Sequence, residues 1–167
     1  MEGKAGPMSD NLYVLGRVLM PWVFIVSAIG KFINVAGVVG SAGMARFESM
    51  IGGSVPPTVV GYIVALIEIV GGLMVLVGFK TRFGGWLLFV FTALTIFFAH
   101  NFWDMEGAAR AANQTQALKN LAIMSACLLI ASIGSGRYAV DSRNSMARTN
   151  ARVPGDVAVG QTAQRQF

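Results

Sequence analysis

A carboxylate, Glu68, lies near the middle of a long apolar segment. A charged group at the centre of a membrane costs on the order of 2.5 to 3.5 kcal/mol on insertion scales, so such a residue usually has a partner or a function. At helical spacing Glu68 shares one stripe with Gly61, Ala65 and Gly72, and small residues let a neighbouring helix approach closely. We therefore predict that Glu68 faces other helices.

Two basic residues on the first apolar segment are candidate partners for Glu68. Arg17 and Lys31 fall on one helical stripe, about 21 Å apart at 1.5 Å per residue. By the same rise, Glu68 is expected about 8 Å in depth from Arg17, a gap that two extended side chains can bridge. We expect an ion pair between Glu68 and Arg17. Three roles stay open for it: fixing helix register, carrying a proton, or binding a ligand.

A second polar group is expected at the ends of the apolar segments that lie farthest from Arg17. Its members are Lys31, His100, Asn101, Gln116, Lys119 and Asn120. A lone histidine can accept a proton, contact a ligand or donate to a carbonyl. Because no cysteine neighbours His100 and no HxxxH spacing is present, we expect no metal site. We assign no catalytic residue, but His100 and Asn101 are suited to holding the carbonyls of a quinone between apolar walls.

The elements that position these residues are membrane-spanning helices. Of 167 residues, 54% are hydrophobic and 13% charged, and the mean hydropathy is +0.61, which exceeds what a soluble domain of this size buries. Four segments reach the roughly 20 apolar residues that a span needs: 11–34, 59–79, 83–103 and 118–136. We predict an all-α, integral membrane four-helix bundle, with a short interfacial helix near 44–51.

The basic residues predict the orientation of the chain rather than a nucleic-acid partner. The net charge is +5, and if four spans alternate, most cations fall on one side. These cations are Lys4, Lys80, Arg82, Arg137, Arg143, Arg148 and Arg152. By the positive-inside rule that side is cytoplasmic. We expect both termini in the cytoplasm, with residues 1–10 as a short leading segment and residues 137–167 as a basic, disordered tail.

The inventory of redox groups is small. Cys127 is the only cysteine, and there is no CxxC motif, no pair of haem-ligating histidines and no flavin or dinucleotide motif. The chain is therefore not expected to carry electrons by itself and needs no intrinsic cofactor. Gly84 and Gly85 are small residues that, if they face lipid, are suited to a contact between two copies of the chain.

The order and spacing of these residues resemble the DoxX family of small four-helix membrane proteins. The similarity covers about residues 12–142. It rests on Arg17, Gly30-Lys31, Glu68, Gly71-Gly72, Gly78, Arg82, the His100-Asn101-Phe102-Trp103 segment, Gln116, Lys119-Asn120, Gly136 and Asp141.

This resemblance implies a role near redox chemistry without assigning a reaction. Some DoxX-like proteins are linked to terminal oxidase or thiosulfate:quinone oxidoreductase systems, and one mycobacterial type is described as a membrane scaffold for oxidative-stress enzymes. We expect a non-catalytic subunit or scaffold of a redox assembly in the inner or plasma membrane of a bacterium, with an oxidoreductase as possible partner. Two alternatives stay open: binding or transport of a lipophilic molecule such as a quinone, and a purely structural membrane protein.

Overall fold

The computed structural model describes residues 7–142, and helices joined by short turns make up this part of the chain. The helices are α1 (Pro7–Leu19), α2 (Trp22–Ile33), α3 (Val35–Val39), α4 (Ala42–Ile51), α5 (Pro57–Val77), α6 (Thr81–Ala99), η1 (Phe102–Asp104) and α7 (Gly107–Ile133). Four helical stretches are long and apolar enough to cross a membrane: Met8–Ile33, Pro57–Val77, Thr81–Asp104 and Gly107–Ile133. The predicted all-α class, with four helices able to cross a membrane by length and composition, is confirmed.

The first and last spans depart most clearly from the boundaries expected from the sequence. The first span consists of two helices, because Pro21 has no backbone N–H and its ring crowds the preceding turn; α1 ends at Leu19 and α2 begins at Trp22. The last span begins at Gly107 rather than at Leu118. The added stretch is polar but rich in alanine, the residue with the highest helix propensity.

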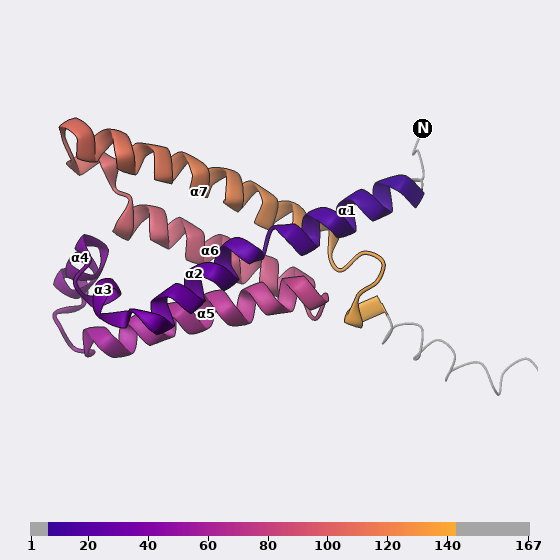
Figure 1. Cartoon of the computed structure of the whole chain (residues 1–167), viewed down its shortest axis with the longest axis horizontal. Coiled ribbons are helices and arrows are strands. Elements are labelled where there is room, and N and C mark those ends of the chain that lie inside the picture. Colours follow the sequence, from indigo (N-terminus) through magenta and orange to yellow (C-terminus); the bar gives the residue numbers. More distant parts are fainter. Residues whose placement is uncertain (1–6, 143–167) are drawn as a thin grey trace, which may run out of the picture.

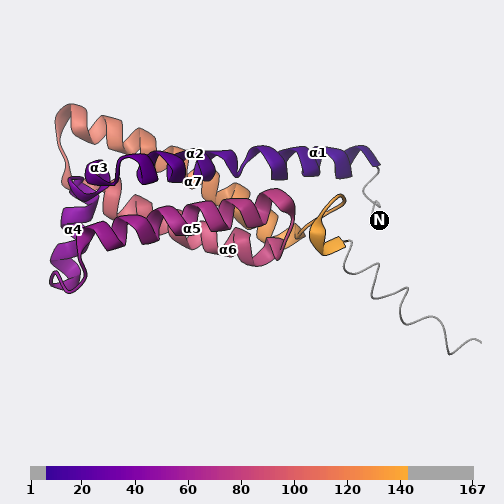
Figure 2. The ribbon, with the colours of Figure 1, turned by 60° about the horizontal axis from the view of Figure 1, so that its bottom comes forward.

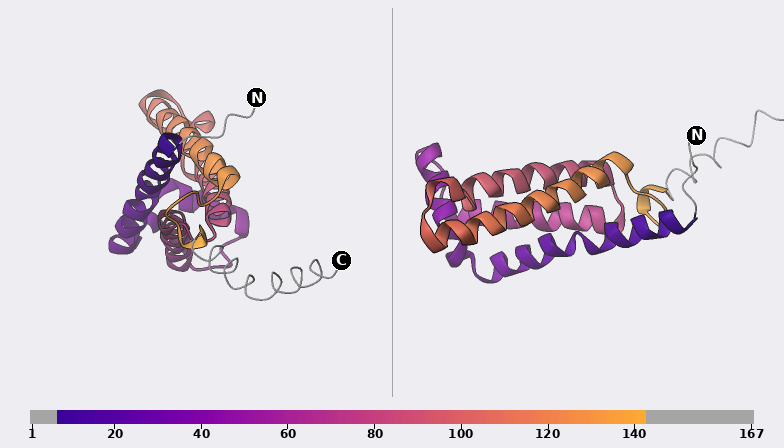
Figure 3. Two further views of the ribbon diagram at one scale, coloured as in Figure 1. Left: turned by 90° about the vertical axis from the view of Figure 1, so that its right-hand side faces the viewer. Right: turned by 90° about the horizontal axis from the view of Figure 1, so that it is seen from above.

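The spans pack in chain order, α2 on α5, α5 on α6 and α6 on α7. Figure 1 shows α3 and α4 gathered at one end of the molecule, where α5 begins, with the α5–α6 turn at the other end. α1 continues the line of α2 above α5 in Figure 2. Figure 3 shows the long helices running along one common direction. The end near the α5–α6 turn is therefore also the end from which α1 starts.

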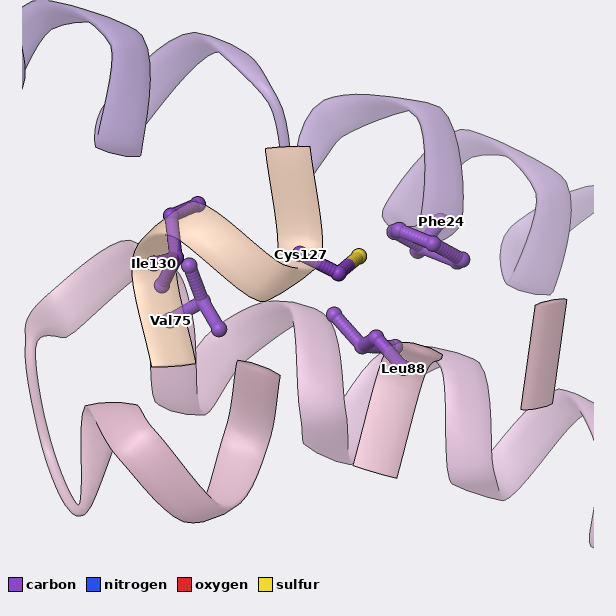
Figure 4. Packing of buried hydrophobic residues seen from close by; sticks show 5 residues of the cluster. All are labelled: Phe24, Val75, Leu88, Cys127 and Ile130. Carbon is purple, nitrogen blue, oxygen red and sulfur yellow. The ribbon is translucent and has the colours of Figure 1, made fainter. Parts of the chain in front are cut away.

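One hydrophobic cluster joins all four spans (Figure 4). Its buried members are Phe24 from α2, Val75 from α5, Leu88 from α6, and Cys127 and Ile130 from α7. Many large apolar side chains face outward instead; Leu66 is 54% exposed and Leu129 62% exposed. Such outer faces suit a protein whose solvent is lipid.

Small residues lie where helices approach one another. Gly61, Ala65 and Gly72 are buried together with Glu68, so the predicted inward stripe is confirmed. Gly85, however, does not face lipid, because a Cβ built there would lie 2.9 Å from the backbone nitrogen of Ala131 on α7. Gly84 likewise packs against α5. The prediction that these two glycines form an exposed contact between copies is wrong, since both bring α6 close to its own neighbours.

The short helix expected between the first two spans is α4. Ser41 caps it by accepting a hydrogen bond from the Met44 amide at 3.2 Å, and Gly52 ends it with a φ of 68°, which favours glycine. Its location at a membrane surface and the cytoplasmic orientation of both termini stay predictions.

Candidate functional site

Glu68 forms an ion pair with Lys31 inside the helix assembly. Lys31 Nζ lies 2.7 Å from Glu68 Oε2, and the side chains are 24% and 6% exposed, respectively. Ser27 Oγ donates to Glu68 Oε1 at 3.1 Å and accepts from Lys31 Nζ. The three residues form a closed polar triad in which α2 supplies the cation and the hydroxyl, and α5 supplies the carboxylate.

The predicted pairing of Glu68 with Arg17 is therefore wrong. Side chains on an α-helix lean toward its N-terminus. Lys31 leans back over Ser27, one turn earlier, and so reaches the level of Glu68. Arg17 lies before the middle of the span, so the same lean directs its side chain away from Glu68 and toward the C-terminal end of α5. The separation of about 8 Å expected between Arg17 and Glu68 counts only the rise per residue. It omits the direction in which each side chain leans and treats the two helices separated at Pro21 as one.

Arg17 instead binds backbone carbonyls near one end of the helices. Its guanidinium donates to the carbonyl oxygens of Val75 at 3.0 Å, Leu76 at 3.3 Å and Tyr138 at 3.2 Å. The first two carbonyls belong to the last turn of α5, where few backbone N–H donors remain; the Val75 carbonyl also accepts from the Gly78 amide at 3.3 Å. Arg17 is only 2% exposed, and its role is to join α1, α5 and the segment that follows α7.

The segment after α7 is packed rather than disordered up to residue 142. Ala139 is 3% exposed, and Tyr13 donates a hydrogen bond to the carbonyl of Gly134. Asp141 accepts from the backbone amides of Lys80 at 3.0 Å and Thr81 at 3.2 Å, which caps the start of α6. The predicted disorder does not hold for residues 137–142, and residues 143–167 lie outside the described part of the chain.

An apolar pocket of about 330 Å³ adjoins the Lys31–Glu68 pair. Its walls come from α5 and α6, chiefly Ile63, Val64, Ile67, Phe91, Leu94, Thr95 and Phe98, and from Ser41, Gly43, Met44 and Phe47 beside or within α4. Ligand pockets are commonly about 300 to 1,000 Å³, mostly apolar, and contain a few polar groups that orient the ligand. This pocket has that composition, with one ion pair among hydrophobic and aromatic side chains.

Contacts of α4 with the end of α6 keep α4 against the pocket. Arg46 Nη1 donates to the carbonyl oxygen of Phe98 at 2.6 Å, one of the carbonyls that a helix C-terminus leaves without intrahelical donors. Gly43 lies directly on Ala99, where an added Cβ would be 3.1 Å away. The close approach places Met44 and Phe47 on the pocket.

The second predicted polar group is not assembled as one site. Lys31 belongs to the pair with Glu68. His100 Nδ1 lies within hydrogen-bonding distance of Asn113 Oδ1, at 3.1 Å, and Asn101 donates to Asp104 at 2.8 Å. The remaining members, Gln116, Lys119 and Asn120, lie on α7 away from the pocket lining, with the first two exposed.

Some residues of the site carried a signal in the sequence and others did not. Ser27 lies four residues before Lys31, which places the two on one helical face, so this partner was open to prediction. Phe91, Thr95 and Phe98 resemble any apolar or weakly polar residue of a span. Only the lateral order of the helices assigns them to the pocket.

Comparisons with known proteins identify a family and two relatives in the inner membrane. The sequence profile of the DoxX family matches residues 12–101, which include α2 to α6 and so every residue that lines the pocket. The chain belongs to the DoxX family. Inner membrane protein YqjF of Escherichia coli (strain K12) is 34% identical over 134 residues, covering 80% of this chain and 92% of that protein. Inner membrane protein YphA of the same organism is 28% identical over 141 residues, covering 84% and 94%, respectively.

No solved structure matches the chain. The DoxX match ends at residue 101, whereas Asn113, Gln116, Lys119 and Asn120 lie beyond it, on α7. The part of the chain shared with the family profile therefore contains the triad and the pocket.

Proposed function

We propose that this DoxX-family protein is a non-catalytic inner-membrane protein that binds a lipophilic molecule carrying a hydrogen-bond acceptor, of which a quinone is an example. The observation that carries the proposal is the Lys31–Glu68 pair beside an apolar pocket of about 330 Å³. The location in the inner membrane is supported by the names of the two E. coli relatives and by the four apolar helices.

The donors of Lys31 explain which ligand chemistry suits the pocket. An ammonium group has three N–H donors, and the triad uses two of them, toward Ser27 and Glu68. The lysine side chain is also more exposed than its partner, 24% against 6%, and both residues line the pocket. The third donor suits a ligand carbonyl or hydroxyl oxygen, while the aromatic and aliphatic walls suit an apolar body.

The test compares ligands that differ only in the acceptor. Purified protein in mild detergent is heated with menadione or with 2-methylnaphthalene, which has the same fused rings without the two carbonyls. A ligand present at 100 times its Kd stabilises the folded state by about 2.7 kcal/mol. We expect menadione to raise the melting temperature and 2-methylnaphthalene to leave it unchanged.

Two valine variants on α5 separate binding from folding. Val64 lines the pocket, so Val64→Phe should fill it and abolish the menadione shift. Val70 is 42% exposed on the outer face, and Val70→Phe should retain the shift. Equal responses to the two compounds, or an unchanged shift in Val64→Phe, would refute binding in this pocket.

A second candidate function is that of a subunit or scaffold in a redox assembly. It is favoured by membership of the DoxX family, because some DoxX-like proteins are linked to such systems. It is also compatible with a single cysteine and the lack of a recognised cofactor motif, from which we expect no electron carrier within the chain itself. Affinity purification of the tagged full chain in gentle detergent, followed by proteomics, tests it. Stoichiometric recovery of an oxidoreductase would support this function, and its repeated absence would exclude a stable assembly.

A further inference from the structure

A second cavity, at the other end of the helices, faces the α5–α6 turn. Its volume is about 640 Å³, and its lining combines cations, hydroxyls and apolar side chains. The lining includes Phe79, Lys80, Thr81, Arg82, Phe83 and Asp141. None of them lines the pocket beside Lys31 and Glu68, so the proposed function does not use this cavity.

We propose that this cavity binds the headgroup of an anionic phospholipid, with Lys80 and Arg82 contacting its phosphate. Both cations are exposed, and neither belongs to a salt bridge within residues 7–142, where the pairs are Lys31–Glu68 and Arg137–Asp10. Guanidinium and ammonium groups are the usual protein donors to phosphate. Basic pockets between membrane helices bind anionic headgroups by this chemistry.

The position of the cavity favours a lipid over a small soluble anion. α5 ends at Val77 and α6 begins at Thr81, so the turn between two spans lies at a membrane boundary. Phe79 is 42% exposed and Phe83 60% exposed, and these rings supply the apolar surface along which an acyl chain packs. A free phosphate has no group that would use this surface.

Asp141 does not cancel the positive charge of the site. Its carboxylate accepts from the amides of Lys80 and Thr81, and from the Thr81 hydroxyl at 3.4 Å. These donors belong to the N-terminal turn of α6, whose partial positive charge stabilises a carboxylate. The Asp141 carboxylate thus bonds to backbone and hydroxyl donors and not to the two side-chain cations, of which Lys80 lies over the Phe79 ring with its Nζ 5.8 Å from the ring centroid. The lining keeps a net charge of +1 from two cations and one carboxylate.

Native mass spectrometry of the full chain in detergent tests the proposal with phosphatidylglycerol and phosphatidylcholine of identical acyl chains. We expect the wild type to retain phosphatidylglycerol selectively. The double variant Lys80→Asn/Arg82→Gln should lose at least about tenfold in affinity, because it removes both charged donors to the phosphate. Asparagine suits position 80, because Lys80 has a φ of 44°, which asparagine tolerates better than most residues.

The matched control removes two cations elsewhere. Arg110 and Lys119 are exposed on α7 outside the cavity, so Arg110→Gln/Lys119→Gln changes the net charge equally and should keep the lipid. An equal loss in this control, or equal retention of both lipids by the wild type, would overturn the proposal. If millimolar inorganic phosphate stabilised the lipid-free protein as much as phosphatidylglycerol does, the ligand would be a small anion, and this result would also overturn the proposal.

Discussion

Replacing Lys31 with methionine should destabilise the protein more than replacing both Lys31 and Glu68. The single variant leaves the Glu68 carboxylate, whose side chain is 6% exposed, with one hydrogen bond from Ser27. Removing one partner of a buried ion pair costs about 3 to 5 kcal/mol. Because the Lys31 side chain is 24% exposed, we expect the lower end of this range, about 3 kcal/mol.

The double variant Lys31→Met/Glu68→Met removes both charges and keeps similar side-chain volumes. Replacing a buried ion pair by well-packed apolar residues is often neutral or stabilising, so we expect the double variant to lie within about 1 kcal/mol of the wild type. With Glu68→Met measured alone, the cycle gives the coupling energy between the two residues. The sign and size of this coupling energy show how far the stabilising effect of each charge depends on the other charge.

The assay is reversible unfolding in mixed micelles with increasing dodecyl sulfate, followed by far-UV circular dichroism. The control pair is Asp10 and Arg137, whose charged atoms lie 3.6 Å apart and whose side chains are 38% and 56% exposed. Exposed pairs contribute about 0 to 1 kcal/mol, so the same cycle there should show little coupling. A double variant at positions 31 and 68 that loses the sum of the two single losses would refute the reasoning, because additivity means that neither charge depends on the other.

Three further predictions use the same unfolding assay. Gly85→Ala should cost about 1 to 3 kcal/mol, because the added methyl meets the backbone of α7 at 2.9 Å, whereas Gly16→Ala, with nothing within 4 Å, should gain about 0.5 to 1 kcal/mol from helix propensity; equal effects would contradict the packing. Asp141→Ala should cost about 0.5 to 2 kcal/mol, since the first turn of α6 loses its cap, and no loss would mean that the cap does not form. Tyr13→Phe should cost about 1 kcal/mol by removing the hydrogen bond to the segment after α7; an unchanged free energy of unfolding would show that this bond is not formed in the native state.

The sequence alone predicts the class of protein and the burial of Glu68. Runs of about 20 apolar residues specify membrane spans because each helix satisfies its own backbone hydrogen bonds. A 3.6-residue period is equally local, so the stripe of Gly61, Ala65, Glu68 and Gly72 already shows the face that is buried. Neither inference needs to know which helix lies beside which.

Tertiary structure alone decides the partner of Glu68 and the pocket next to it. Arg17 and Lys31 lie on the same predicted stripe, and only the break at Pro21 and the lean of each side chain bring Lys31, not Arg17, to the carboxylate. Residues of the pocket walls, such as Phe91 on α6, owe their place to the lateral packing of α6 on α5 and to α4 lying against the end of α6. These contacts join residues far apart in sequence. The hydrophobic period of a helix indicates which of its faces is buried but not which other helix packs against that face.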